Sequence, residues 1–216
     1  MKKNDESIRK ILKDMQKMKY ISPDEIPNID LYMDQMTTFM DEHLKYTRRS
    51  EDDKMLTKTM INNYTKNNLL PPPNKKKYSK EHILLLVFIY YFKNILSISD
   101  IQSLCKPLTE RFFGKEEDGG ISLEQIYEEV FQYEKGYIDP TMIDIVRKYR
   151  KAKESFHWDV NEEDREFLTT FSLICSLSFD VYVKKMIVQK LIDEQLMGNE
   201  EEETEGSKKT EKKNKK

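Results

Sequence analysis

The sequence predicts an all-α protein. Its 216 residues include only six glycines and seven prolines, which leaves few tight turns and little room for an all-β fold. Lys, Glu, Met, Leu and Ile, which favour helix, are abundant. Apolar residues make up 38% of the chain and charged residues 35%, so the chain can bury a core as one sizeable domain or two small ones.

Two amphipathic stretches open the chain. Residues 1–24 are polar and rich in Lys, and their modest apolar stripe indicates a short helix docked on the body. From Pro27 onward, apolar residues recur at helical spacing and predict a long helix over about 29–45. The stripe positions are Ile8, Ile11, Leu12, Met15 and Met18 in the first stretch, and Ile29, Tyr32, Met33, Met36 and Met40 in the second.

A short helix follows at 57–67, in "LTKTMINNYTKNNLL". Thr57 is the expected N-cap, Leu56 and Ile61 stand at the two positions of a hydrophobic staple, and Asn68 is placed to end the helix in a left-handed conformation. One face is apolar and the opposite face is wholly polar. The apolar face consists of Met60, Ile61 and Tyr64, and the polar face of Thr59, Asn62, Asn63 and Lys66.

Capping residues mark the later helices. The apolar runs 83–92 and 167–179 are both shorter than the ~20 residues that a membrane-spanning helix needs, so both are expected to be buried helices and no membrane association is expected. The expected helix signals are Ser79 before Lys80, the capping boxes Ser97/Asp100 and Ser122/Gln125, Asp139-Pro140, Asn161 at the start of the last long helix and Gly198 at its end.

No enzyme chemistry is expected from the sequence. It contains no Gly-rich phosphate loop, no HExxH and no paired Cys motif, and His43, His82 and His157 have no metal-ligand spacing. No catalytic residue, metal or cofactor is therefore predicted. Cys105 and Cys175 read as reduced core thiols of a cytoplasmic protein, and Trp158 as an anchor between two helices.

Charge is segregated along the chain. Residues 54–82 hold seven Lys and one Glu, whereas residues 110–134 carry a net charge of −6 that ordinary solvated helix faces explain. In the basic segment, the polar face of helix 57–67 suits a major groove, where Asn can bond adenine and Thr and Lys can reach phosphates. Lys75, Lys76 and Lys77 follow on a turn stiffened by Pro71–Pro73. A solvated loop between two helices accounts for the same lysines equally well.

The segment "TMINNYTKNNLLPPPNKKKYSKEHI" resembles the recognition helix and wing of MerR-type transcription regulators. Tyr64 matches the family's phosphate-contacting tyrosine, Leu69–Pro72 match the turn, and Lys76 stands where a wing arginine is usual. Asn62 replaces the usual recognition-helix arginine, the wing is shorter, and the long dimerisation helix is not evident. Taken whole, residues 25–190 resemble an uncharacterised bacterial family, a domain of unknown function, with a MerR-like helix-turn-helix head.

The resemblance implies a MerR-like helix-turn-helix DNA-binding domain at 25–108, with at most a minimal β-wing at 73–78, and a helical C-terminal domain at 109–198. They lie between an N-terminal segment at 1–24 and a charged tail at 199–216, which has no apolar residue and is expected to be disordered. The last long helix, at 161–197, and the apolar helix at 80–93 are expected to supply the core and a homodimer face.

The leading hypothesis is a sequence-specific regulator of transcription that binds double-stranded DNA. The sequence identifies no effector ligand. The rival hypothesis is a protein-interaction module on a degenerate helix-turn-helix scaffold, whose acidic second half and charged tail contact a partner; an enzyme is a distant third. The expected base-reading residues are Asn62 and Asn63, and the expected phosphate contacts are Thr59, Tyr64, Lys66, Lys75, Lys76 and Lys77.

Overall fold

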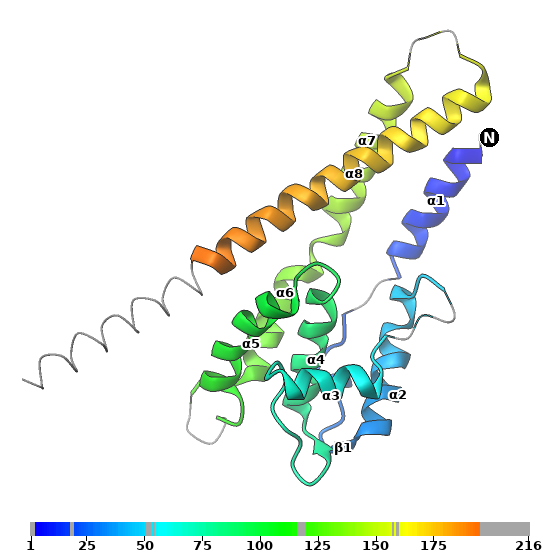
Figure 1. Ribbon diagram of the computed structural model, residues 1–216. Coiled ribbons are helices and arrows are strands. Elements are labelled where there is room, and N and C mark those ends of the chain that lie inside the picture. The colour runs from blue at the N-terminus through cyan, green and yellow to red at the C-terminus, as the bar shows by residue number, and fades with distance from the viewer. Residues whose placement is uncertain are drawn as a thin grey trace, which may run out of the picture.

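The computed structural model is 72% helical, with two strands of two residues each, which confirms the all-α prediction. It describes residues 3–17, 20–50, 53, 55–115, 120–156, 158 and 160–194. A lower head contains helices α2 to α6, and α7 and α8 form a hairpin above it with α1 alongside (Figure 1). Gly198, His157, Met18 and the tail at 199–216, on which the sequence made predictions, lie outside the described residues.

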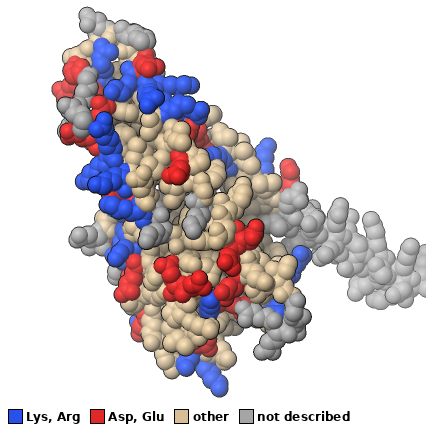
Figure 2. Space-filling view, turned by 180° about the vertical axis from the view of Figure 1, so that it is seen from behind, with Lys and Arg blue, Asp and Glu red and all other residues tan. Residues whose placement is uncertain are grey.

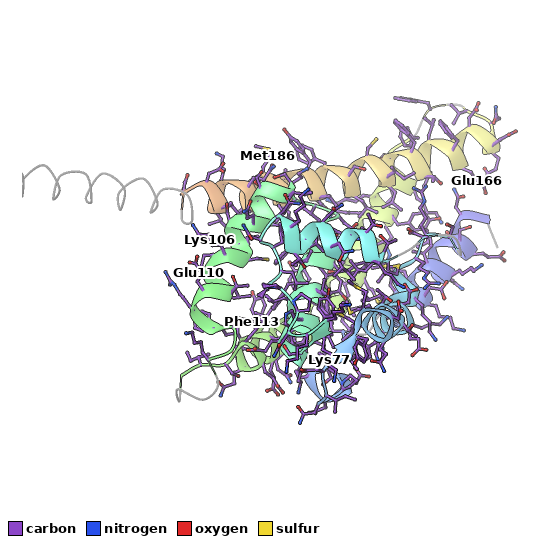
Figure 3. All side chains as sticks on the ribbon, turned by 60° about the horizontal axis from the view of Figure 1, so that its bottom comes forward. Lys77, Lys106, Glu110, Phe113, Glu166 and Met186 are labelled. Carbon is purple, nitrogen blue, oxygen red and sulfur yellow. The ribbon has the colours of Figure 1, made fainter. Side chains whose placement is uncertain are left out.

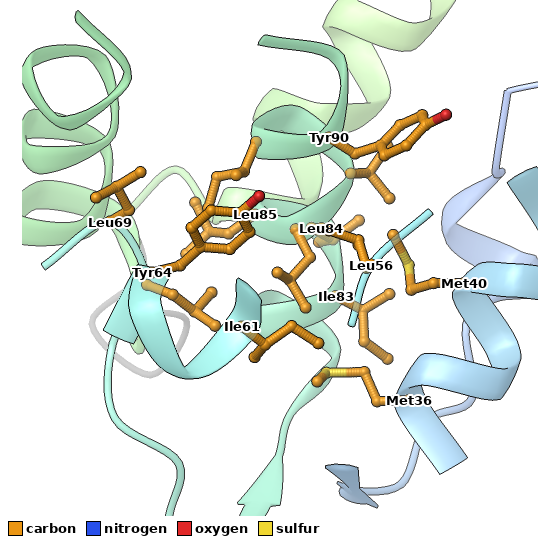
Figure 4. Close-up of a cluster of buried hydrophobic side chains, with 14 of the residues drawn as sticks. Met36, Met40, Leu56, Ile61, Tyr64, Leu69, Ile83, Leu84, Leu85 and Tyr90 are labelled. Atoms are coloured by element: carbon orange, nitrogen blue, oxygen red, sulfur yellow. The ribbon is translucent and has the colours of Figure 1, made fainter. Parts of the chain in front are cut away.

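The head is built around α4 (Lys80–Phe92), whose residues Ile83 to Val87 are all almost completely buried. A helix that is apolar on every side must be enclosed, and α4 packs against α5, α6 and strand β2. Side chains from α2 and α3 complete the cluster, in which Ile83 and Leu84 face Met36 and Ile61 (Figure 4). The prediction of a buried helix over 83–92 is therefore confirmed.

The long helix expected at 29–45 is shorter than predicted. Strand β1 (Leu31–Tyr32) comes first, and α2 runs from Met33 to Leu44. The Tyr32 backbone N–H donates to the Gln35 side chain at 2.9 Å, which fixes the start of the helix after Tyr32. Ile29 and Tyr32 are exposed, so they do not extend the apolar face. Two 3₁₀ turns flank this region, at Pro23–Glu25 and Lys45–Thr47.

The two predicted capping boxes are confirmed. Asp100 N–H donates to Ser97 Oγ at 3.1 Å, and Gln125 N–H donates to Ser122 Oγ at 3.1 Å. Helix α5 continues through Pro107 to Phe112, beyond the "ISDIQSLC" segment predicted from the sequence and across the boundary expected at residue 108. The helices that these caps start are α5 (Ile98–Phe112) and α6 (Leu123–Lys135).

The upper part consists of α7 (Ile138–Glu154), α8 (Glu162–Ile192) and the docked N-terminal helix α1 (Lys3–Met15). Tyr149 Oη donates to Asp5 Oδ1 at 2.7 Å, and Ile8 packs on a second small core, so the prediction that the N-terminal helix docks on the body is confirmed. Asn161 caps α8 as predicted, accepting from Asp164 N–H at 2.8 Å. The cap predicted at Asp139 is wrong, because α7 already starts at Ile138 and Tyr137 stands at its N-cap position.

Predicted burial fails along α8. The run 167–179 was expected to be buried, but Phe167, Phe171 and Phe179 are each more than half exposed. Cys175 is exposed as well, although Cys105 is buried as predicted, and Trp158 is 66% exposed rather than an anchor. The reason is that α8 packs one face on α7 and leaves the opposite face uncovered along much of its length. No helix among the described residues is both long and apolar enough to cross a membrane.

Candidate nucleic-acid interface

Helix α3 (Lys58–Lys66) is fixed at both ends by the residues that the sequence indicated. The Thr57 side chain accepts from Met60 N–H at 3.2 Å, and Leu56 and Ile61 are both buried, as a hydrophobic staple requires. Asn68 has a φ of 55°, so it ends the helix in the left-handed conformation predicted for it. An ion pair between Lys58 and Asp34 joins the first turns of α3 and α2.

The outer face of α3 is fully polar and exposed. Thr59, Asn62, Asn63 and Lys66 are all exposed. Within the described part of the chain, the side chains of these four residues make no hydrogen bond or ion pair. The structure therefore gathers four of the predicted contact residues on one helix face, with their donors and acceptors available to a ligand.

Tyr64 lies on the other face of α3. Its side chain is only 8% exposed and belongs to the main core, beside residues of α4 (Figure 4). Burial raises the pKa of the Tyr64 hydroxyl, so the side chain stays neutral. Tyr64 falls three residues after the fully buried Ile61, a spacing that puts both on one side of a helix. Most of the Tyr64 side chain thus serves the core, and the phosphate contact expected of it stays a prediction.

The chain from Asn74 to Lys77 forms a two-residue hairpin turn. Asn74 N–H donates to Lys77 O at 3.0 Å and Lys77 N–H donates to Asn74 O at 2.9 Å. The central residues Lys75 and Lys76 have φ values of 49° and 68°, the sign that a type I′ turn requires at both positions. Such turns usually place Asn, Asp or Gly there, because Gly has no Cβ and Asn and Asp tolerate positive φ better than other residues.

This turn and the strand that follows it, residues 74–78, are called the wing below. Strand β2 (Lys77–Tyr78) pairs antiparallel with β1, so that Tyr32 lies opposite Lys77. Lys77, labelled in Figure 3, is partly buried. Its ammonium lies 5.3 Å from the centre of the Tyr32 ring. Lys75 and Lys76 are exposed, and within the described residues neither forms an ion pair. The tip therefore presents two uncompensated positive charges.

His82, in the first turn of α4, packs against the base of the wing. It is 4% exposed, its Nδ1 accepts from Ser79 N–H at 3.0 Å, and its ring meets those of Tyr78 and Phe113 edge to face. This hydrogen bond forms the capping box that starts α4 at the predicted residue. Burial lowers the pKa of the His82 imidazole, so the ring is neutral at pH 7. His82 is a structural residue that holds β2 onto α4.

Sequence reasoning missed a second basic surface, formed by α1 and α7. Figure 2, which views the molecule from behind, shows basic side chains gathered at the upper left, where these helices lie. Arg9 and Arg150 line the same hollow, although 141 positions separate them in the chain. The available signal was the i, i+4 spacing of basic residues on each helix. The exposed basic residues are Arg9, Lys10 and Lys13 of α1 and Arg147, Arg150, Lys151 and Lys153 of α7.

No metal site accompanies these surfaces: the described residues contain no cluster of three His, Cys, Asp or Glu side chains. The features above define an all-α protein whose head presents a short polar helix and a lysine-tipped hairpin. The chain belongs to the family described as Domain of unknown function (DUF1836), whose model matches residues 21–130. The match covers the head through most of α6 and excludes α1, α7 and α8. No curated protein and no solved structure matches the chain.

Proposed function

We propose that this chain is a sequence-specific DNA-binding protein with a MerR-like helix-turn-helix head, acting as a regulator of transcription in the cytoplasm. The observation that carries the proposal is the exposed polar face of α3 together with the two-lysine tip of the wing. A helix in the major groove with basic residues flanking it is a common way to combine base reading with phosphate contacts.

The roles follow from the side chains. Asn62 and Asn63 carry amides that can bond the two groove-facing atoms of adenine. Thr59 and Lys66 flank them and reach phosphates on either side, and Lys75 and Lys76 contact the backbone from the wing. Lys77 contributes less, because its charge already lies against the Tyr32 ring. Tyr64 is not part of the proposed contact set.

The conformation of the wing tip supports this proposal over a merely solvated loop. Two consecutive lysines at positive φ are strained, since each left-handed non-Gly residue costs roughly 1–2 kcal/mol. Strained residues concentrate at functional sites, where the surrounding structure maintains them. Here the reciprocal Asn74–Lys77 hydrogen bonds and the pairing with β1 hold the turn. We therefore attribute the lysines to a requirement for charge at this point.

In this proposal the protein binds DNA as a homodimer, and the two copies pack together through α8. Phe167, Phe171 and Ile174 recur at helical spacing and are each more than half exposed. Tyr182 extends the same face along a helix of 31 residues, about 46 Å long. An apolar face of this length on a monomer marks an interaction surface. A second copy is the occupant we propose, because paired half-sites require two recognition helices related by symmetry.

Selection from a random pool of duplex DNA by the full-length protein tests the proposal, since no operator is known in advance. We expect an enriched sequence, and replacement of Asn62 by Ala should cost about 1–3 kcal/mol at one base position and relax its preference. The double variant Lys75→Ala/Lys76→Ala should weaken binding to every sequence and reduce the salt dependence.

The control removes charge from the second basic surface, in the double variant Arg150→Ala/Lys151→Ala. We expect this control to bind like the wild type. If it loses affinity while the Lys75/Lys76 variant does not, DNA contacts α1 and α7 rather than the wing. If no sequence is enriched and no duplex binds at low salt, the proposed function is wrong.

The exposed face of α8 also favours the rival function, a non-enzymatic module that binds another protein. The two functions differ in oligomeric state, because the module leaves α8 free for a different partner. A monomer in solution that binds no DNA but retains a defined protein partner through α8 supports the module. A homodimer with an enriched DNA sequence supports the regulator.

A further inference from the structure

A cavity of about 290 Å³ lies between α4, α5 and α6. Phe88 and Tyr91 line it from α4, Cys105 from α5, and Tyr127 from α6, and Tyr20 closes it from the segment before the head. The rim residue Val130 is 38% exposed, so the cavity opens to solvent along α6. It lies on a different part of α4 from the residues that face α2 and α3.

The walls of the cavity carry no charge. All the lining residues are aliphatic or aromatic apart from Cys105, whose thiol stays protonated because burial raises its pKa to about 12. Tyr127 Oη donates to the backbone oxygen of Ile21 at 2.7 Å. Burial and the neighbouring Tyr46 raise the pKa of the Tyr91 hydroxyl. Of the polar groups in the lining, Tyr127 Oη is already hydrogen-bonded, and no charged group is present to compensate a charged guest.

Aromatic rings form much of the lining. The Tyr20 ring meets Tyr91 at 5.8 Å between centroids and Phe131 edge to face at 5.5 Å. The rings of Phe88 and Tyr127 meet at 5.2 Å between centroids. Ring edges and faces at these separations favour an aromatic guest, which can add edge-to-face and offset contacts of its own.

We infer that this cavity is a binding site for a small, neutral aromatic molecule of about two fused rings. A dry cavity of roughly 150 Å³ holds one benzene, so 290 Å³ has room for a bicyclic compound. The neutral lining excludes carboxylates, phosphates and ammonium ions, which would lose their hydration without a partner. Residues 199–216 contain no apolar side chain, so that segment of the chain is not a plausible filling.

Equilibrium dialysis of the full-length protein with 2-naphthol, followed by its fluorescence, tests the inference. We expect one equivalent to bind, and naphthalene-2-sulfonate, which matches it in shape but is charged, to bind at least about 10-fold more weakly. Saturating 2-naphthol should also slow modification of Cys105 by methyl methanethiosulfonate. The exposed Cys175 serves as the internal control, with an unchanged rate.

A variant that blocks the entrance locates the site. Val130→Trp places a large side chain at the rim, where partial exposure lets the protein fold, and should weaken 2-naphthol binding at least about 10-fold. Ile143→Trp, on an exposed position of α7, should bind as the wild type does.

Three binding results overturn the inference: no binding of 2-naphthol, equal binding by Val130→Trp, or equal binding of the sulfonate. A change of oligomeric state in Val130→Trp would also overturn it, by showing that a second copy covers this surface. None of these measurements uses DNA, so the inference fails or stands separately from the proposed DNA binding.

Discussion

Lys75 and Lys76 at the tip of the wing are conformationally strained and are also proposed to bind phosphate. Replacing them should therefore change the stability of the fold and the affinity for DNA in opposite directions. Replacing them with the residues that a type I′ turn prefers, in the double variant Lys75→Asn/Lys76→Gly, removes the strain and the charge together. The variant should therefore be more stable than the wild type and bind DNA less well. A substitution that merely disrupted the fold would lower both.

The expected gain in stability follows from the two φ values, 49° and 68°. A left-handed residue with a Cβ costs roughly 1–2 kcal/mol, and the greater freedom of Gly in the unfolded chain returns about 0.5–1 kcal/mol of that. Asn tolerates the conformation better than Lys and adds a smaller gain. The free energy of unfolding should rise by about 1 kcal/mol, which raises Tm by about 2–4 °C for a chain of this size.

The expected loss of DNA binding follows from counterion release. Each phosphate contact contributes about 0.9 to the slope of log K against log salt concentration, so losing two contacts reduces the slope by about 1.8. Between about 50 and 200 mM salt, a slope difference of about 1.8 changes the ratio of the two affinities by about 12-fold. The wild type should have its largest advantage at the lowest salt.

Thermal unfolding and fluorescence anisotropy with a selected duplex measure the two effects. The matched control is Lys75→Arg/Lys76→Arg, which keeps both charges and the strain, and should bind DNA with the slope of the wild type. A variant Lys75→Asn/Lys76→Gly that melts lower than the wild type would refute the argument from strain. One that melts higher but binds DNA with an unchanged slope would show that the lysines touch no phosphate.

Two further predictions concern His82 and α8. Burial lowers the pKa of His82 in the folded protein below its ordinary 6.5, so the unfolded chain binds a proton more readily than the folded one. The stability that neutral His82 contributes is therefore complete above about pH 6.5 and falls as the pH drops toward the folded pKa. His82→Gln keeps an acceptor for Ser79 N–H but does not titrate, and should flatten denaturant-measured stability between pH 5 and about 6.5; equal curves for both proteins would contradict this. Phe171→Asp should convert a dimer of twice 25.9 kDa into a monomer in light scattering, whereas Tyr133→Asp, exposed on α6, should not; a wild-type monomer would rule out the dimer.

The features predicted well from sequence are those that depend on a few neighbouring residues. Thr57, Ser97, Ser122 and Asn161 each cap the helix expected of them, because a cap is formed within one turn of chain. Burial of α4 was also predictable, since a helix with no polar face has only one stable environment.

The features predicted poorly depend on what lies across the fold. The apolar run of α8 was predicted to be buried, but Phe167 and Phe171 are exposed. An apolar pattern does not reveal whether the surface that covers it belongs to the same chain or to another molecule. Tyr64 matched a motif residue, yet its position beside Ile61 placed it in the core. The left-handed lysines gave no signal, because the two central positions of the turn lack the Gly or Asn that usually marks them.

Helix α4 lies at the centre of the head and is enclosed by the other elements, which explains why it has no polar face. Ile83 and Leu84 face α2 and α3 and so set the position of the polar face of α3 (Figure 4). At its start, Ser79 and His82 fix β2 and with it the lysine tip. Farther along, Phe88 and Tyr91 line the aromatic cavity. The helix that positions both parts of the proposed DNA surface is therefore also a wall of the inferred ligand site, so a guest that shifted α4 would move α3 and the wing together.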